Sequence, residues 1–350
     1  GGEAPALGSS VYGAGVLVAP GVKPQYMDEA ILGVEVALTD DLKIGVSFHD
    51  RRLGRVLEDV SPDNTETYIL SNPGEFPEEE EARLRARLEA TTDPAERARL
   101  EHQLEIFTGI RDFEKPTRVH NSLQLQVVKR FARSFFLQGS YTYARTRGNF
   151  PGLYSPDSGA IIPNITAQYD LIELLGNRDG PLPSDRPHDL KVDGYYVADL
   201  EKAGELTAGA RFRIASGTPI DALASSNMYG YDESFVLPRG AFGRTSVDAG
   251  LDLHLSYGRK LGKDLQLEVF TDVFNVFNRQ ATSYPDESYS YDPVNPILGG
   301  DSEDLVWAKA QDWDGNEPDD PQSPSRNRNF RNAETRTPPL AARLGARLMF

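Results

Sequence analysis

Residues 246–258 read SVDAGLDLHLSYG, a stretch in which apolar and polar side chains alternate without a break. Val247, Leu251 and Leu255 fall on one side of this alternation, whereas Asp252 and His254 fall on the other. A period of two residues is typical of a β-strand that has one apolar and one polar face. The stretch therefore predicts a strand that lies between a hydrocarbon environment and water.

The same alternation recurs along the chain, mostly in pairs of segments that are separated by a short turn. The paired segments are 32–38 with 42–48, 123–131 with 135–143, 190–196 with 206–214, and 247–257 with 265–273. A last segment, 340–350, stands alone and ends on Phe350. A short turn between two alternating segments indicates a β-hairpin, so the sequence predicts nine antiparallel strands.

The connections between these segments alternate strictly in length. Turns of a few residues are followed by the long stretches 51–117, 146–186, 217–244 and 279–338. In an up-and-down sheet this order places every short turn at one end and every long loop at the other, as in outer-membrane barrels. A water-soluble all-β domain would explain the alternation but not this asymmetry. The sequence therefore predicts an all-β fold, a transmembrane antiparallel up-and-down β-barrel.

The first long loop is predicted to contain a helical hairpin. Residues 78–88 and 95–107 read as two helices, and Thr92 or Asp93 can cap the second one. Four leucines are expected to form the contact between the helices: Leu84, Leu88, Leu100 and Leu104. The charged residues on their other faces are typical of solvated helix surface.

The composition excludes several kinds of function. With 37 Lys and Arg against 53 Asp and Glu, the net charge is −16, which disfavours a nucleic-acid binder. The absence of cysteine excludes a disulfide scaffold, a thiolate metal site and a cysteine nucleophile. No apolar run reaches the roughly 18 residues of a transmembrane helix. Because the chain starts at Gly1 without a signal peptide, we expect it to be processed from a longer chain or to be part of one.

Several phrases of the sequence resemble one family. Residues 270–280 read FTDVFNVFNRQ, which is similar to the penultimate strand of TonB-dependent outer-membrane receptors. The phrases SYTYAR at 140–145, GNFPGLY at 148–154 and DRPHDLK at 185–191, together with the ending 338–350, resemble Oar-like members. Over nearly its whole length, the chain is identified as the C-terminal barrel portion of such a receptor.

The resemblance implies a 22-stranded barrel with an N-terminal plug, of which this chain would supply about the last nine strands. Residues 1–25 would then form an external loop, and residues 26–350 the C-terminal part of the barrel. The stretches 51–117, with the helical insert, and 279–338, which is acidic, would be external loops. Nine strands alone leave two unpaired edges in lipid, so we expect a separate chain that carries the plug and the N-terminal strands.

The resemblance also implies a function, because TonB-dependent receptors take up scarce nutrients through the bacterial outer membrane. We therefore expect an integral outer-membrane location with extracellular long loops, and contact with lipid and lipopolysaccharide. The expected partners are an unknown small ligand and TonB, the latter reached through the separate chain, whereas nucleic acid is not expected. Two alternatives stay open: an Oar-like protein of surface adhesion or scaffolding, and a soluble β-enzyme.

The sequence contains no catalytic constellation, so no enzyme is expected. The histidines have no metal-ligand spacing, and a G-x-S-x-G nucleophile elbow is absent. Closely spaced oxygen ligands around a glycine turn form a candidate calcium site, which consists of Asp312, Asp314, Asn316 and Asp319. The alternative for this segment is a solvated acidic loop. Calcium is the one cofactor that the sequence suggests.

Strand alternation places a set of polar residues toward the barrel interior, where we expect them to bind the plug rather than to line a substrate channel. This set is Gln124, Gln126, Arg130, Gln138, Ser140, Thr142, Lys191, Asp193, Arg211, Arg213, Asp248, Asp252, Gln266, Glu268, Asp272, Arg343 and Arg347. The aromatic residues of the opposite face are expected at the lipid interface. They are Tyr141, Tyr143, Tyr196, Tyr257 and Phe350.

Overall fold

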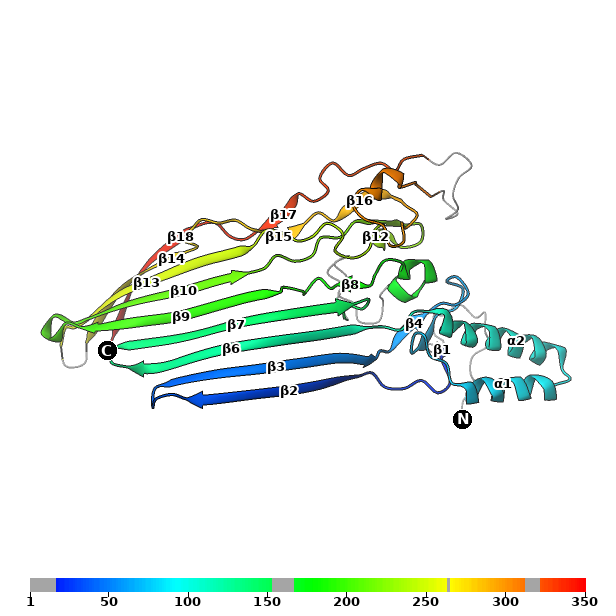
Figure 1. Ribbon diagram of the computed structural model, residues 1–350, viewed down its shortest axis with the longest axis horizontal. Helices are drawn as coiled ribbons and strands as arrows, with labels where there is room; N and C mark the ends of the chain where they lie inside the picture. The colour runs from blue at the N-terminus through cyan, green and yellow to red at the C-terminus, as the bar shows by residue number, and fades with distance from the viewer. Residues whose placement is uncertain (1–16, 153–166, 263–264, 312–321) are drawn as a thin grey trace.

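One large antiparallel sheet dominates the computed structural model, which describes residues 17–152, 167–262, 265–311 and 322–350 (Figure 1). Nine long strands follow one another in chain order from one edge of the sheet to the other. They are β2 (Tyr26–Ala37), β3 (Leu42–Arg55), β6 (Arg118–Ala132), β7 (Phe135–Gly148), β9 (His188–Asp199), β10 (Glu205–Ala215), β13 (Asp248–Lys260), β14 (Gln266–Phe274) and β18 (Ala341–Met349). A short tenth strand, β8 (Gly180–Pro181), pairs with the end of β7.

The predicted antiparallel up-and-down sheet is confirmed, because each segment with alternating residues overlaps one of these strands. Some strands are longer than the alternation indicates. β3 continues to Arg55, β6 begins at Arg118 and β7 ends at Gly148. At these strand ends both faces of the sheet carry polar residues. Backbone pairing between the strands therefore extends beyond the segments in which apolar and polar residues alternate.

The two ends of the sheet differ as the loop lengths predict. Figure 1 shows the short hairpin turns together at one end of the strands, and the helices and long connections together at the other end. Within the described residues the sheet is open, since β2 and β18 each pair on one side only. Closure into a 22-stranded barrel therefore stays a prediction.

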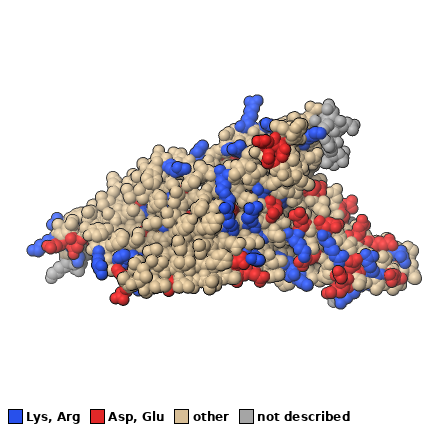
Figure 2. All heavy atoms as spheres, viewed as in Figure 1, with Lys and Arg blue, Asp and Glu red and all other residues tan. Residues whose placement is uncertain are grey.

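The long strands carry an apolar face that none of the described residues covers. Leu32 on β2 is 74% exposed and Leu344 on β18 is 85% exposed. The clusters of buried hydrophobic residues lie among the long connections instead. Figure 2 shows charged side chains gathered densely over the helices, whereas the surface over the strands carries far fewer. A large exposed apolar surface of this kind marks an interface with a membrane or with another protein.

The helical hairpin forms as predicted. It consists of α1 (Glu78–Ala90) and α2 (Pro94–Gly109). Asp93 caps α2, because its carboxylate accepts a hydrogen bond from the Ala95 amide at 3.1 Å. The four leucines that were expected between the helices all belong to one hydrophobic cluster, in which Leu84 and Leu100 are buried and Leu88 and Leu104 are partly buried.

The described parts of the long connections, together with residues 17–25, form what we call the loop layer. Its other elements are β1 (Leu17–Val18), β4 (Glu58–Val60), β5 (Ile69–Ser71), η1 (Ile110–Asp112), η2 (Ala167–Tyr169), η3 (Ile172–Leu175), β11 (Leu223–Ser226), β12 (Gly230–Phe235), β15 (Thr282–Pro285), β16 (Ser288–Pro293), η5 (Asp304–Trp307) and β17 (Ala333–Arg336). One further turn, η4 (Glu201–Ala203), connects β9 to β10 at the opposite end. The sequence did not predict these small strands, because strands of a few residues carry no recognisable alternation.

Candidate functional site

One row of residues crosses the polar face of the sheet from β7 to β18. Directly opposite partners in antiparallel strands share a face, so successive registers define the row. Its members, which we call the cross-strand row, are Phe136, Tyr195, Gly209, His254, Asp272 and Arg343. The row is aromatic on one side of Gly209 and charged on the other.

The charged half of the cross-strand row is joined by hydrogen bonds through one carboxylate. Asp272 Oδ1 lies 2.7 Å from His254 Nδ1, and Arg343 Nε donates to Asp272 Oδ2 at 2.7 Å. Because a carboxylate can only accept, His254 Nδ1 carries the proton, and Nε2 of a neutral ring is then an acceptor. Asp272 thereby fixes the orientation of both neighbours.

The aromatic half is joined by ring stacking. The Tyr195 ring lies 5.2 Å from the Phe136 ring and 5.7 Å from the Phe131 ring, centroid to centroid. Both phenylalanines come from β6 and β7, on one side of Tyr195. The other side of Tyr195 borders Gly209, which has no side chain.

A cavity of about 500 Å³ lies at this interruption of the cross-strand row. Tyr195 and His254 both line it, together with Asp193, Arg211 and Asp252. Arg211 Nε donates to Asp193 Oδ1 at 2.6 Å, and Asp252 Oδ1 accepts the backbone N–H of Asn275 at 2.8 Å. We call this cavity the Gly209 notch.

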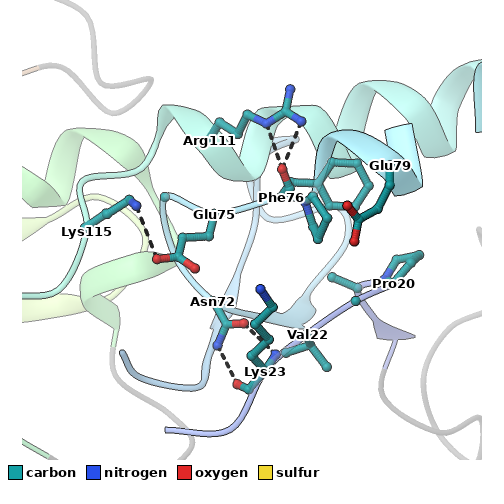
Figure 3. Close-up of a pocket in the computed structure, with 13 residues that line it drawn as sticks. Pro20, Val22, Lys23, Asn72, Glu75, Phe76, Glu79, Arg111 and Lys115 are labelled. Carbon is teal, nitrogen blue, oxygen red and sulfur yellow. Dashed lines mark hydrogen bonds and ion pairs between the residues drawn. The ribbon is translucent and has the colours of Figure 1, made fainter. Parts of the chain in front are cut away.

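A second cavity, of about 400 Å³, lies in the loop layer beside the start of α1 (Figure 3). The Asn72 amide donates to the Lys23 carbonyl at 2.9 Å and accepts the Lys23 N–H at 2.8 Å. Glu75 forms ion pairs with Lys115 and Arg55, each at 3.2 Å. Partial burial disfavours the Glu75 carboxylate, but these two cations outweigh it and lower the pKa of the group. These wall residues bind one another, so the contacts join Lys23 and the end of β3 to the segments that precede and follow the helical hairpin.

Three long connections meet in one hydrogen-bonded chain of side chains. The hydroxyl oxygens of Tyr68 and Tyr229 are 2.7 Å apart, and Tyr229 also forms a hydrogen bond with Asp170. Asp170 is 3% exposed and lies near Asp59. Burial raises the pKa of Asp170 to about 7, with a further contribution from the Asp59 charge. We call the chain of Tyr68, Tyr229 and Asp170 the tyrosine clasp.

A buried ion pair within the connection 217–244 also contacts a second connection, 146–186. Arg239 Nη1 lies 3.2 Å from Asp221 Oδ2, and both side chains are almost completely buried. The Phe235 ring lies between two guanidinium groups, 4.3 Å from that of Arg239 and 5.1 Å from that of Arg178. Arg239 Nε also donates to the Arg178 carbonyl at 3.0 Å. These contacts tie residues that precede β8 to residues that follow β11 and β12.

The structure brings together part of the set that was predicted to face the interior. Asp193, Arg211 and Asp252 lie side by side at the Gly209 notch, and Glu268 pairs with Arg347 at 3.5 Å. The calcium candidates lie outside the described residues, so calcium binding at Asp312, Asp314, Asn316 and Asp319 stays a prediction. The described part of the chain contains no group of three His, Asp or Glu residues that could hold a metal ion.

Two features of the site were not predicted from the sequence. Tyr195 and Gly209 were not identified, although the alternation places them on the polar face; only strand register shows that they are neighbours. The tyrosine clasp has no signal in the sequence, because its members come from three connections without periodicity.

No protein-family model matches the chain. Over 341 residues, or 96% of the chain, the sequence is 33% identical to the TonB-dependent transporter Oar of Myxococcus xanthus. By sequence, the chain corresponds to part of an Oar-like TonB-dependent transporter. It spans 29% of the length of Oar.

Solved structures of outer-membrane receptors show a weaker similarity. The ferric preacinetobactin receptor BauA of Acinetobacter baumannii has a TM-score of 0.43 at 12% identity, with 77% of this chain and 29% of that chain covered. The ferric-catecholate import receptor Fiu of E. coli has a TM-score of 0.40 at 12% identity, with 76% and 25% covered. Among the residues that the structure describes, this Oar relative has no helix that is long and apolar enough to cross a membrane.

Proposed function

We propose that this Oar relative forms part of the wall and the external loops of a TonB-dependent transporter in the bacterial outer membrane. A separate chain supplies the plug and the remaining strands, and TonB acts through that chain. The long connections gather a small ligand on the extracellular side and lie against lipopolysaccharide, while the apolar face of the sheet contacts lipid.

The observation that carries this proposal is the uncovered apolar face of a sheet with two open edges. Leu253 and Leu255 are exposed on this face, whereas their neighbours Asp252 and His254 lie on the polar face with hydrogen-bond partners. Backbone groups at an open strand edge cannot be left without partners in lipid, because each such group costs several kcal/mol. The sheet therefore needs both a hydrocarbon environment and further strands from elsewhere.

Cysteine labelling in outer membranes tests this arrangement, since the chain has no cysteine of its own. Leu255→Cys should react with a maleimide that partitions into lipid. The matched control is Gly250→Cys on the same strand, where an added Cβ meets nothing within 4 Å on the polar face. This control should not react with the lipid-soluble reagent. Reaction of Gly250→Cys in place of Leu255→Cys, or recovery of the chain from the soluble fraction, would overturn the proposal.

One observation favours a second candidate, a surface adhesion or scaffold protein. The helical hairpin projects from the loop layer (Figure 1), and its surface carries ion pairs such as Arg85 with Glu81 at 2.7 Å. Such a rigid projection suits contact with another surface. Deletion of residues 78–109 separates the two functions: TonB-dependent ligand uptake survives the deletion in a transporter, whereas an adhesin loses its attachment to surfaces.

A further inference from the structure

We propose that the Gly209 notch receives an arginine side chain of the polypeptide that lies against the polar face of the sheet. The inference rests on the proposed function, in which a separate chain carries the plug. It adds to that proposal the type of side chain that the separate chain places in the notch.

Nothing in the described part of the chain requires residue 209 to be glycine. Its backbone is not in the left-handed region, and an added Cβ would meet only ordinary contacts, at 3.5 Å from His254 Cβ and 3.7 Å from Tyr195 Cβ. Glycine in the interior of a strand weakens the strand, and it often marks the close approach of another group. The missing side chain therefore points to an occupant from outside the sheet.

The shape of the notch fits a flat group. Tyr195 and His254 flank β10 from the two neighbouring strands, so their backbones are about 9.6 Å apart, or two strand spacings. A planar group between two rings needs about 3.5–4 Å on either side. A guanidinium or an aromatic ring meets this requirement, whereas a lysine ammonium does not fill the width.

The charges at the notch select a cation. Three carboxylates line the cavity: Asp193, Asp252 and Asp272. Two guanidinium groups pair with them, Arg211 with Asp193 and Arg343 with Asp272. The third carboxylate, Asp252, forms no ion pair in the described part of the chain, and its Oδ1 accepts the backbone N–H of Asn275, so it is the carboxylate left for a further cation.

Arginine meets both requirements of the notch, because its side chain ends in a group that is planar and positively charged. Its guanidinium can stack on the side of Tyr195 that faces β10, in a cation–π contact, while it donates to the Asp252 carboxylate. The ring of His254 forms the opposite wall of the notch. A planar cation with several donors therefore matches the walls and the floor of the notch.

The test is a cross-link between a new thiol and an arginine in native outer membranes. Gly209→Cys, in an Arg211→Lys background that removes the neighbouring guanidinium, is treated with a maleimide–phenylglyoxal reagent, which joins thiols to arginine. We expect an interchain product in which mass spectrometry finds a modified arginine of the partner. The matched control is Gly250→Cys in the same background with Arg213→Lys added, which removes the guanidinium opposite position 250, and it should give at least tenfold less interchain product.

Asp252→Asn should lower the yield of this product several-fold, whereas Asp248→Asn on the same strand should not. Suppose that a partner chain is present but gives no arginine product, or that it reacts only with a reagent that joins thiols to amines. In either case the proposal that an arginine occupies the Gly209 notch is wrong, and the proposed function still stands. If no partner chain accompanies the protein in the membrane, both proposals fail.

Discussion

The Tyr229 hydroxyl group binds the buried carboxyl group of Asp170, and the two residues come from different long connections of the chain. Tyr229 also contacts the Tyr68 hydroxyl at 2.7 Å, so a single hydroxyl group holds three connections together. Asp170 is 3% exposed, and one of its carboxyl oxygens has no hydrogen-bond partner among the described residues. Its charged form is therefore poorly stabilised, and the loop layer gains sensitivity to pH at this point.

The stability of the tyrosine clasp should fall as the pH rises. The pKa of Asp170 is 3.8 in an unperturbed chain and about 7 in the fold, so the folded loop layer retains a proton that the unfolded chain loses. Stability is then full below pH 3.8 and is lost progressively up to about pH 7. Hydrogen exchange of residues 167–175, corrected for intrinsic rates, should show more opening at pH 8 than at pH 4.

Asp170→Asn should remove this dependence, because the amide keeps the acceptor for Tyr229 but cannot ionise. At pH 8 the variant should exchange more slowly than the natural protein, and at pH 4 the two should agree. Asp112→Asn, at an exposed position, is the control that should leave the pH profile unchanged. A variant at position 170 that kept the full pH dependence would show that another group titrates.

Tyr229→Phe should loosen all three connections at once. The substitution keeps the ring and removes the hydroxyl group, so both Tyr68 and Asp170 lose a partner. Loss of a buried hydrogen bond costs about 1–3 kcal/mol when a partner is left unsatisfied. Limited proteolysis should cleave the loop layer faster in Tyr229→Phe. Tyr231→Phe, whose residue is 66% exposed, should behave like the natural protein, and equal rates for the two variants would contradict a role for the clasp.

Arg239→Ala should disrupt the loop layer more strongly than any exposed substitution. It leaves the Asp221 carboxylate in a site where that side chain is 3% exposed, and removal of one partner from a buried pair costs about 3–5 kcal/mol. We expect rapid proteolysis between β8 and β12 at a temperature where the natural protein resists. Arg328→Ala, at an exposed position, serves as the control. Resistance of Arg239→Ala equal to that of the control would show that the ion pair is dispensable.

The sheet could be predicted from the sequence because each of its strands separates an apolar from a polar environment. Leu251, Leu253 and Leu255 carry a period of two that no local exception interrupts. The helical hairpin could be predicted for a similar reason, since Leu84 and Leu88 lie four residues apart, as do Leu100 and Leu104, and Asp93 precedes a proline. In the strands and in the helices alike, a periodic pattern of apolar residues indicates which side chains face an apolar environment.

The site depends on contacts that no single segment records. Tyr195, Gly209 and His254 meet because of the register of three strands, and a shift by one residue would separate them. Asp170 and Tyr229 meet because two irregular connections fold over the same end of the sheet. Register and loop packing follow from the whole fold, so a search for local motifs could not find these residues.

Asp272→Asn should weaken the attachment of the last strand, because Asp272 on β14 accepts hydrogen bonds from both His254 on β13 and Arg343 on β18. The amide cannot accept from both neighbours with the same strength, since its nitrogen only donates. Arg343 is largely exposed, so we expect the temperature of unfolding to fall by a few degrees rather than folding to fail. This temperature can be measured in isolated membranes, as the temperature at which the protein changes from the gel mobility of the folded form to that of the unfolded form. Glu268→Gln is the matched control on the same pair of strands, where the ion pair with Arg347 is longer, at 3.5 Å. A larger effect of Glu268→Gln than of Asp272→Asn would mean that the cross-strand row does not hold β18 in place.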